Sequence, residues 1–341
     1  MNALTPIVTV RAASTADGPA IRGFVDAHPE AELFHRPEWT EAVAQGCGQP
    51  AHLLLAEDGR GALVGLLPLT EMRSPLFGAA LVSTGFGIGG GVLGEGVEPL
   101  AEAAWQLAQE RGCGSVELRG GPVPSGWSRH EGVYASFARP LAAEDEAILK
   151  AIPRKQRAEV RRALGFGLEV RVDRDVRAHY RAYSESVRNL GTPVFPRRLF
   201  EAFLAAFGED ADILTIRHAG RPVASVLSLY HRGTVYPYWG GGTGEARALR
   251  ANDLLYYELM RHAARRGCTR FDFGRSKLGT GAYAFKKNWG FEPRPLVYAT
   301  RGDARETNPM SPKYRLQVAA WRKLPLWLAN RLGPPIARGL G

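Results

Sequence analysis

The 341-residue sequence has few residues able to bind a metal or form disulfides. It contains three cysteines, Cys47, Cys113 and Cys268, and no CxxC pair. Its eight histidines are scattered, with no HExxH motif and no pair four residues apart. A disulfide framework, a structural zinc site and a catalytic metal are therefore not expected. Scarce, unpaired cysteine also fits a reducing compartment.

Long hydrophobic runs are missing as well. No apolar run approaches the ~20 residues that span a bilayer. The first residues, MNALTPIVTVRAAS, lack the basic and apolar regions of a signal peptide. We therefore expect a cytoplasmic protein. A hydrophobic content of 45% and a charged content of 23% are typical of a soluble protein, and the length predicts two domains.

Acidic residues are in short supply in the second part of the chain. Residues 1–143 carry 9 Lys+Arg against 15 Asp+Glu, a net charge of −6. Residues 144–341 carry 35 against 19, a net charge of +16. This asymmetry favours an anionic partner for the second part of the chain. Nucleic acid, a phosphate-bearing substrate and a membrane surface are the three alternatives.

An internal repeat predicts the fold. Residues 51–69 and 211–230 each resemble a hairpin, and each is followed by an apolar strand that ends in glycines, at 81–91 and 235–242. Each copy continues with a helix that ends at Arg-Gly-Cys and with a further strand, at 116–121 and 271–276. Cys113 and Cys268 are expected to be buried and inert, and Asn252 to cap the second helix. Two β-β-β-α-β modules predict an α/β (α+β) fold of tandem GNAT-like acyltransferase domains, with mixed sheets and flanking helices.

The predicted domains are residues 1–143, a connecting basic helix at 144–167, a second domain at 168–300, and a C-terminal tail at 301–341. Pro153 must interrupt or restart the connecting helix. After it, Arg154, Arg157 and Arg161 share one face, which either meets a polyanion or is solvated. The tail mixes tryptophans and leucines with basic residues. It either docks on the body, which we favour, or lies on an anionic membrane surface.

The stretch from Phe271 to Phe291 carries the strongest functional signal. A short aromatic strand is predicted to stop at Gly274 and to release the next residues into a glycine-bounded loop, which a brief helix follows. Four cations suggest that the stretch binds an anionic group: Arg275, Lys277, Lys286 and Lys287. The alternative is a buried strand with a solvated basic loop. Elsewhere, Gly85–Gly90 matches GxGxxG, but no helix opens there, so dinucleotide binding is not expected.

Several runs resemble the FemAB family, within it the subgroup that accompanies exosortase/PEP-CTERM systems. They are FDFGRSKLGTGAYAFKKNWGF, IPRKQRAEVRRAL, SESVRNLGTPVFP and NPMSPKYRL, and the resemblance covers nearly the whole chain. It implies tandem GNAT-like domains and transfer of an amino acid from aminoacyl-tRNA to the stem-peptide amine of a peptidoglycan precursor. The family's F-K-x-x-[FW]-G motif matches Phe285–Gly290, so the resemblance assigns substrate contact to Lys286.

Two features depart from related patterns. Acetyl-CoA-dependent GNAT enzymes hold the pyrophosphate on a [QR]-x-x-G-x-[GA] loop, whereas Arg247–Asn252 contains no glycine. A CoA pyrophosphate is therefore not expected to bind there in the usual way. The chain also lacks the coiled-coil insertion of some FemAB proteins, which puts tRNA contacts of that kind in doubt.

The predicted reaction is aminolysis of an activated carbonyl, which needs an unprotonated amine, a donor for the oxyanion, and orientation. We assign Lys286 to carbonyl or phosphate stabilisation, Tyr283 to protonation of the leaving oxygen and Asp272 to relay of the amine proton. Asp272 alternatively pairs with a nearby arginine. Arg275, Lys277 and Lys287 are assigned to an anionic part of the substrate, and Arg154, Arg157 and Arg161 to a polyphosphate or tRNA. Tyr238, Trp239, Arg188 and Asn189 are candidates to line a substrate groove.

The favoured hypothesis is a FemAB-like acyl or aminoacyl transferase without a tightly bound cofactor. Its partners would be a nucleotide-linked or lipid-linked envelope precursor and tRNA. One alternative is a CoA-dependent N-acyltransferase that acts on an amino sugar or exopolysaccharide. The other is a non-catalytic module that binds RNA or anionic lipid. The tail suggests a cytoplasmic protein that is peripheral at the inner membrane.

Overall fold

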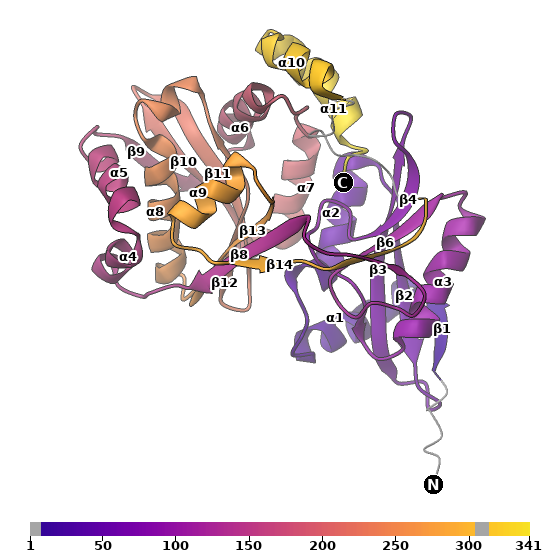
Figure 1. Cartoon of the computed structure of the whole chain (residues 1–341). Coiled ribbons are helices and arrows are strands. Elements are labelled where there is room, and N and C mark those ends of the chain that lie inside the picture. Colours follow the sequence, from indigo (N-terminus) through magenta and orange to yellow (C-terminus); the bar gives the residue numbers. More distant parts are fainter. Residues whose placement is uncertain (1–7, 304–313) are drawn as a thin grey trace. The chain divides into compact units, whose positions relative to one another are not determined.

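The computed structural model describes residues 8–303 and 314–341, which form two units (Figure 1). The first unit contains residues 8–131, 297–303 and 336–341, and the second contains 132–296 and 314–335. The described part of the tail motif NPMSPKY is Tyr314 alone; its other residues lie outside the described ranges.

The first unit has a mixed sheet in the order β1-β2-β3-β4-β6-β15-β7, with β5 paired to β3. Only the β4–β6 pair is parallel among the described pairings of this sheet. Its strands are β1 (Thr9–Ala12), β2 (Ala51–Glu57), β3 (Leu63–Ser74), β4 (Gly78–Ser83), β5 (Leu93–Gly94), β6 (Ser115–Arg119), β7 (Ser128–His130) and β15 (Tyr298–Gly302). Its helices are η1 (Thr15–Asp17), α1 (Gly18–Ala27), η2 (Leu33–His35), α2 (Pro37–Cys47) and α3 (Val97–Glu110).

The second unit has a mixed sheet in the order β14-β8-β13-β12-β11-β10-β9. Helices α4, α5 and α8 pack together on one side, whereas α6 and α7 lie on the other (Figure 1). Its strands are β8 (Tyr134–Pro140), β9 (Glu169–Asp173), β10 (Ala211–His218), β11 (Arg221–His231), β12 (Thr234–Gly242), β13 (Arg270–Lys277) and β14 (Pro293–Pro295). Its helices are α4 (Asp145–Ala151), α5 (Arg154–Leu164), α6 (Val176–Leu190), α7 (Arg197–Phe207), η3 (Gly208–Asp210), η4 (Gly244–Arg247), α8 (Ala251–Arg265), α9 (Gly281–Asn288), α10 (Arg315–Lys323) and α11 (Leu326–Ala337).

The predicted repeat is present twice, as β2-β3-β4-α3-β6 and β10-β11-β12-α8-β13. Both helices end as the Arg-Gly-Cys pattern indicates. The glycines have left-handed backbones, with φ of +64° at Gly112 and +83° at Gly267. The next residue's N–H then donates to the last turn, from Cys113 to Ala108 O at 2.8 Å and from Cys268 to Ala263 O at 2.9 Å. This is the hydrogen bond of a Schellman ending, which satisfies a carbonyl that the helix leaves unpaired.

The predicted cap of the second helix is wrong. α8 begins at Ala251, and its N-cap is Arg250, which has a left-handed φ of +52°. Asn252 is therefore inside the first turn. Its side chain approaches Gly242 so closely that a Cβ on that glycine would lie 2.7 Å from Asn252 Oδ1. The asparagine packs against β12 and does not cap the helix.

The units differ from the predicted ranges because single strands change sheets. After β7, the chain supplies β8 to the second sheet, and after β14 it returns to the first sheet as β15. The basic segment 144–167 is two helices of the second unit, broken at Pro153 as expected, with Ile148, Ile152 and Val160 in that unit's core. It is therefore not a connector between domains.

The described residues of the tail also belong to two units. In the second unit, Arg188 Nη1 on α6 donates to Leu324 O at 3.1 Å, and Arg322 Nη2 donates to Leu190 O at 3.2 Å. In the first unit, Gln49 Nε2 donates to Arg338 O at 2.8 Å. These contacts attach α10 to α6 and attach the last residues to the first unit.

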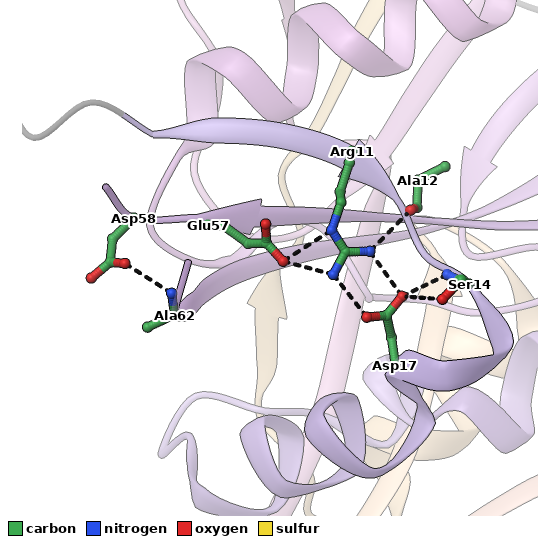
Figure 2. Close-up of polar contacts among 7 residues, drawn as sticks. All are labelled: Arg11, Ala12, Ser14, Asp17, Glu57, Asp58 and Ala62. Carbon is green, nitrogen blue, oxygen red and sulfur yellow. Dashed lines mark hydrogen bonds and ion pairs between the residues drawn. The ribbon is translucent and has the colours of Figure 1, made fainter. Parts of the chain in front are cut away.

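The edge strand β1 is attached to its neighbours by ion pairs (Figure 2). The guanidinium of Arg11 bridges Glu57 on β2 at 2.6 Å and Asp17 at 2.7 Å, and it lowers the pKa of Asp17. Asp17 also accepts hydrogen bonds from the backbone and the hydroxyl of Ser14 (Figure 2). Because these groups are partly exposed, the ion pairs add little to the free energy of unfolding. Their main effect is to hold β1 in position.

A buried carboxylate organises the middle of the first unit. The Glu71 side chain on β3 is 0% exposed and accepts hydrogen bonds from Arg111 at 2.8 Å, His52 at 2.9 Å and Arg73. Burial alone would raise the pKa of Glu71, but these three hydrogen bonds lower it to about 2. One charge thus connects β2, β3 and the end of α3.

We predict that Glu71→Gln lowers the free energy of unfolding by about 2 kcal/mol, between the values typical of exposed and buried ion pairs. Urea unfolding at pH 6 measures the change. The folded pKa of Glu71 lies below the value of 4.5 for the free side chain, so its contribution is complete above that pH and is lost as the pH falls toward 2. The difference between wild type and variant should therefore shrink at pH 3. A difference that is unchanged between the two pH values would contradict this assignment.

Candidate functional site

The central strands of the second sheet diverge. β12 and β13 are parallel and pair only at Thr234–Arg270 and Val235–Phe271. β12 then continues to Gly242 while β13 continues to Lys277, paired on its other side with β8. Beyond these two pairs, the backbone N–H and C=O groups of β12 and β13 no longer bond to each other. Side chains of the rest of β13 and of α9 lie next to this gap in the ladder.

A β-bulge lies at the start of this divergence. The β13–β8 register shifts between Asp272 and Arg275, and Gly274 between them has a left-handed φ of +66°. The predicted end of the strand at Gly274 is therefore wrong. Arg275, Ser276 and Lys277 belong to β13 and pair with Ser136, Ala135 and Tyr134. A glycine inside a strand here allows a bulge, which bends the strand and redirects its side chains.

Lys286 on α9 holds the bulge in place. Its Nζ donates to Phe273 O at 2.7 Å, to Arg275 O at 2.8 Å and to Gly274 O at 3.2 Å. An ammonium has three N–H donors, so all three are used by successive carbonyls of β13. Burial lowers the pKa of Lys286 to about 7, while Asp272 acts to raise it and Arg275 to lower it. These contacts give Lys286 a positioning role, whereas its assignment to a substrate carbonyl or phosphate stays a prediction.

Asp272 lies at the other end of the bulge. Its Oδ1 accepts a hydrogen bond from Gly274 N at 2.8 Å, and it makes no ion pair within the described residues. The described contacts therefore do not show the alternative, in which Asp272 pairs with a nearby arginine. Burial raises the pKa of Asp272, which the N–H of Gly274 partly opposes. A carboxyl with a raised pKa is better suited to accept and return a proton.

Strand β8, which the sequence did not reveal, contacts two of the predicted site residues. The Tyr283 ring meets Phe137 edge to face at 5.2 Å between centroids, and the Arg275 guanidinium lies 4.7 Å from the Tyr134 ring. Lys277 is half-buried at the end of β13, and Lys287 is exposed on α9. The structure therefore places Asp272, Arg275 and Lys286 at one bulge. Tyr283 lies against Phe137 on the neighbouring strand, and Lys287 is exposed.

Tyr256 on α8 is a site residue that the sequence did not identify. Its ring packs against Phe273 at 4.9 Å and Phe285 at 5.6 Å, and burial raises its pKa to about 12. A Cβ on Gly240 would lie 3.1 Å from its hydroxyl oxygen. The glycine of β12 thus lets α8 approach the diverging strand. A tyrosine within an apolar helix is typical of a core, so only the glycines of β12 could have indicated this approach.

The start of α8 carries charges of both signs. Arg250 Nε pairs with Glu159 at 2.7 Å, and Gln156 on α5 donates to Asp253. Burial, followed by the charge of Glu159, raises the pKa of Asp253 to about 6. The absence of glycine from Arg247–Asn252 is therefore the feature that disfavours the usual pyrophosphate site at this helix start.

The remaining candidates lie apart from the bulge. On α5, Arg154 and Arg161 are exposed, and Arg157 is half-buried. Trp239 is 5% exposed and packs on Phe203 at 4.8 Å, so it belongs to the core and does not line a groove. Tyr238, beside it, is half-buried. Arg188 binds the tail through Leu324, and Asn189 is exposed.

Comparisons with known proteins bear on the fold. A family model described as an acetyltransferase (GNAT) domain matches residues 150–287. The fold matches FemX with a TM-score of 0.64 and 16% identity, covering 85% of this chain and 96% of that one. It also matches the C-terminal domain (DUF2156) of a putative lysylphosphatidylglycerol synthetase from Agrobacterium fabrum, with a TM-score of 0.55, 10% identity, and coverage of 85% and 93%. No curated protein matches the sequence significantly.

A tandem GNAT protein from the clavulanic acid biosynthesis pathway is a further structural match, with a TM-score of 0.53, 13% identity, and coverage of 87% of this chain and 98% of that one. The prediction of a tandem GNAT-like fold is therefore confirmed. The family model and the structural matches thus agree on a GNAT-type acyltransferase fold. At these identities the structural matches establish the fold alone.

No group of three or more His, Cys, Asp and Glu side chains among the described residues could hold a metal ion. None of the helices described is long and apolar enough to cross a membrane.

We predict that Lys286→Met destabilises the protein by about 2 kcal/mol, because it leaves three carbonyls of the bulge without donors. The adjacent exposed Lys287→Met is the matched control and should change the free energy of unfolding by less than about 0.5 kcal/mol. Denaturant unfolding measures both, and hydrogen exchange should show faster exchange at Gly274 and Arg275 in the first variant alone. Equal stability of the two variants would remove the positioning role from Lys286.

Proposed function

We propose that this protein is a FemAB-like N-acyltransferase that transfers an aminoacyl or acyl group to an amine of a cell-envelope precursor of the peptidoglycan type. The observation that carries the proposal is the divergence of β12 and β13 beside a bulge to which both Asp272 and Lys286 are hydrogen-bonded. The fold match to FemX over most of both chains supports it. Membership of the exosortase/PEP-CTERM subgroup rests on the sequence resemblance.

The chemistry is an acyl transfer by direct aminolysis. The acceptor nitrogen attacks the carbonyl of an ester or thioester, a C–N bond forms, and the C–O or C–S bond breaks. Asp272 accepts the proton that the amine loses, because burial raises its pKa. Tyr283 donates a proton to the leaving oxygen or sulfur. Lys286 keeps the carbonyls of β13 in position and so fixes Asp272 on the adjoining residue.

The donor is the point on which the candidate functions differ. GNAT domains use acyl-CoA as a substrate, which favours a CoA-dependent transferase acting on an amino sugar or exopolysaccharide. The absence of glycine from Arg247–Asn252 favours another donor, and we propose aminoacyl-tRNA. The exposed Arg154 and Arg161 of α5 would contact its phosphates, together with Arg157.

The acceptor is proposed to be anionic and either nucleotide-linked or lipid-linked. Arg275 and Lys277 at the end of β13, with Lys287 on α9, would bind its charged part. Tyr238, Arg188 and Asn189 are proposed only as more distant contacts. The proposed location is the cytoplasm. A module that binds RNA or anionic lipid without catalysis is the remaining alternative, because the charge of residues 144–341 by itself accounts for such binding.

The test compares donors in one transfer assay. Purified protein is incubated with a UDP-linked stem-peptide precursor and either acetyl-CoA or aminoacyl-tRNA, and the product mass is measured. We expect product with aminoacyl-tRNA only. The double variant Arg154→Gln with Arg161→Gln should weaken tRNA binding. The slope of log affinity against log salt concentration should fall by the amount expected for the loss of about two phosphate contacts.

Product from acetyl-CoA alone would replace the proposed donor and leave the acyltransferase intact. Salt-sensitive tRNA binding with no product from any donor would support the binding module instead. The two results are distinct, because only the second removes the enzymatic function.

We predict that Tyr283→Phe lowers kcat by about tenfold to a hundredfold with little change in KM, because the ring contact with Phe137 is kept and only the proton donor is lost. Steady-state kinetics with the productive donor measures this. Thermal unfolding should show a variant as stable as the wild type. A rise in KM at constant kcat would assign Tyr283 to binding instead of proton transfer.

A further inference from the structure

The tail helices expose apolar side chains to solvent. On α10 and α11, Leu316 is 82% exposed, Trp327 is 69% exposed and Leu332 is 44% exposed. Leu190, whose carbonyl accepts the Arg322 guanidinium, is 65% exposed at the end of α6. Three of these side chains belong to the two tail helices and the fourth to the end of α6, on which α10 packs. Exposed apolar side chains that cluster indicate an interaction surface, whereas isolated ones are ordinary. We call Leu190, Leu316, Trp327 and Leu332 the tail apolar set.

These helices are attached to the second unit by another face. A Cβ on Gly191 would lie 2.5 Å from Val318 Cγ1, which shows how closely α10 approaches the end of α6. Asn330 Nδ2 on α11 donates to Ser184 Oγ at 3.3 Å, and Ala329 is 2% exposed. The tail apolar set is therefore a different face from the one by which these helices pack on the second unit. These side chains remain exposed although both helices are packed on the unit. Figure 1 draws α10 and α11 in yellow.

The charges around this set have one sign. Residues 314–341 contain no aspartate or glutamate. Arg315, Lys323 and Arg331 are exposed on the same two helices, and no ion pair is formed by them in the part of the chain that the structure describes. Exposed cations beside exposed leucine and tryptophan, without any acid, match the chemistry of an anionic lipid surface.

We propose that α10 and α11 bind the surface of an anionic phospholipid bilayer. The tail apolar set enters the boundary between headgroups and acyl chains, where tryptophan is favoured, and Arg315, Lys323 and Arg331 contact lipid phosphates. The helices have 9 and 12 residues, too few to span a bilayer, so they lie along its surface. RNA would use the cations but would leave Leu316 and Leu332 exposed, which is why lipid is the occupant that the surface fits.

This inference goes beyond the proposed transferase activity. It is tested without any substrate, so its failure leaves that activity untouched. If both hold, a lipid-linked acceptor would be presented at the same surface to which the enzyme binds.

The experiment measures co-flotation of the full chain with vesicles of phosphatidylcholine alone and with vesicles containing 30% phosphatidylglycerol. We expect binding to the anionic vesicles, weakened severalfold by high salt because surface charges are then screened. Leu316→Ser with Trp327→Ser should reduce partitioning at least about tenfold. Arg315→Gln with Lys323→Gln should reduce it roughly fivefold per cation.

Two controls separate this surface from the general basic charge. Leu76→Ser removes an exposed leucine of the first unit, 66% exposed, and should leave partitioning unchanged. Arg154→Gln with Arg161→Gln removes two exposed cations from α5 and should also leave it unchanged. Thermal unfolding confirms that each variant is folded.

Trp327 supplies a direct readout. Its fluorescence should shift to shorter wavelength on anionic vesicles, and Trp327→Phe should bind nearly as well while losing that shift. The proposal is overturned if the chain does not bind, if it binds both vesicle types equally at all salt concentrations, or if the α5 variant loses binding as strongly as the tail variants.

Discussion

The contact between the Lys286 ammonium and three successive carbonyls of β13 determines the geometry of the second unit's centre. Carbonyls that point the same way along a bulge cannot all be paired by a neighbouring strand, and a buried carbonyl without a donor is costly. A single ammonium satisfies all three. The strand can then leave β12 after two residue pairs and complete its pairing with β8. The divergence on which the proposed chemistry depends therefore requires this lysine before any substrate is bound.

The repeat could be predicted from the sequence because hairpin turns, glycine-ended helices and apolar strands recur in the same order. The strands β8 and β15 could not, since each lies outside the repeated order and its sheet is decided by partners far away in the chain. The glycine at 274 shows a related limit. Glycine ends strands and also allows bulges, and the pairing with Ser136 to Tyr134 on β8 decides between them. Asn252 was assigned as a cap because the left-handed backbone of Arg250 leaves no trace in the sequence.

The candidate site could be predicted as a set of residues but not as a set of contacts. The motif around Lys286 places Asp272, Tyr283 and Lys286 in one stretch, and in the structure Asp272 and Lys286 both bond to the same bulge. The direction of the Lys286 amine depends on the bulge, which the motif does not contain. Trp239 shows the opposite outcome, because its burial against Phe203 depends on how α7 packs. The position of Tyr256 also depends on packing, since its approach to β12 requires that Gly240 has no side chain.

The two modules have the same order of elements but differ where the parallel strands meet. In the first unit, β4 and β6 pair at four positions, from Ala80–Ser115 to Ser83–Leu118, and the glycine-rich segment after β4 is fastened by Arg119. Its Nη1 donates to Thr84 O at 3.0 Å and to Gly87 O at 2.8 Å. The second unit has two pairs, a bulge and no equivalent arginine among the contacts described for β13. The proposed chemistry is assigned to the second module because the diverging strands and the bulge with Asp272 and Lys286 occur there, whereas β4 and β6 of the first module stay paired.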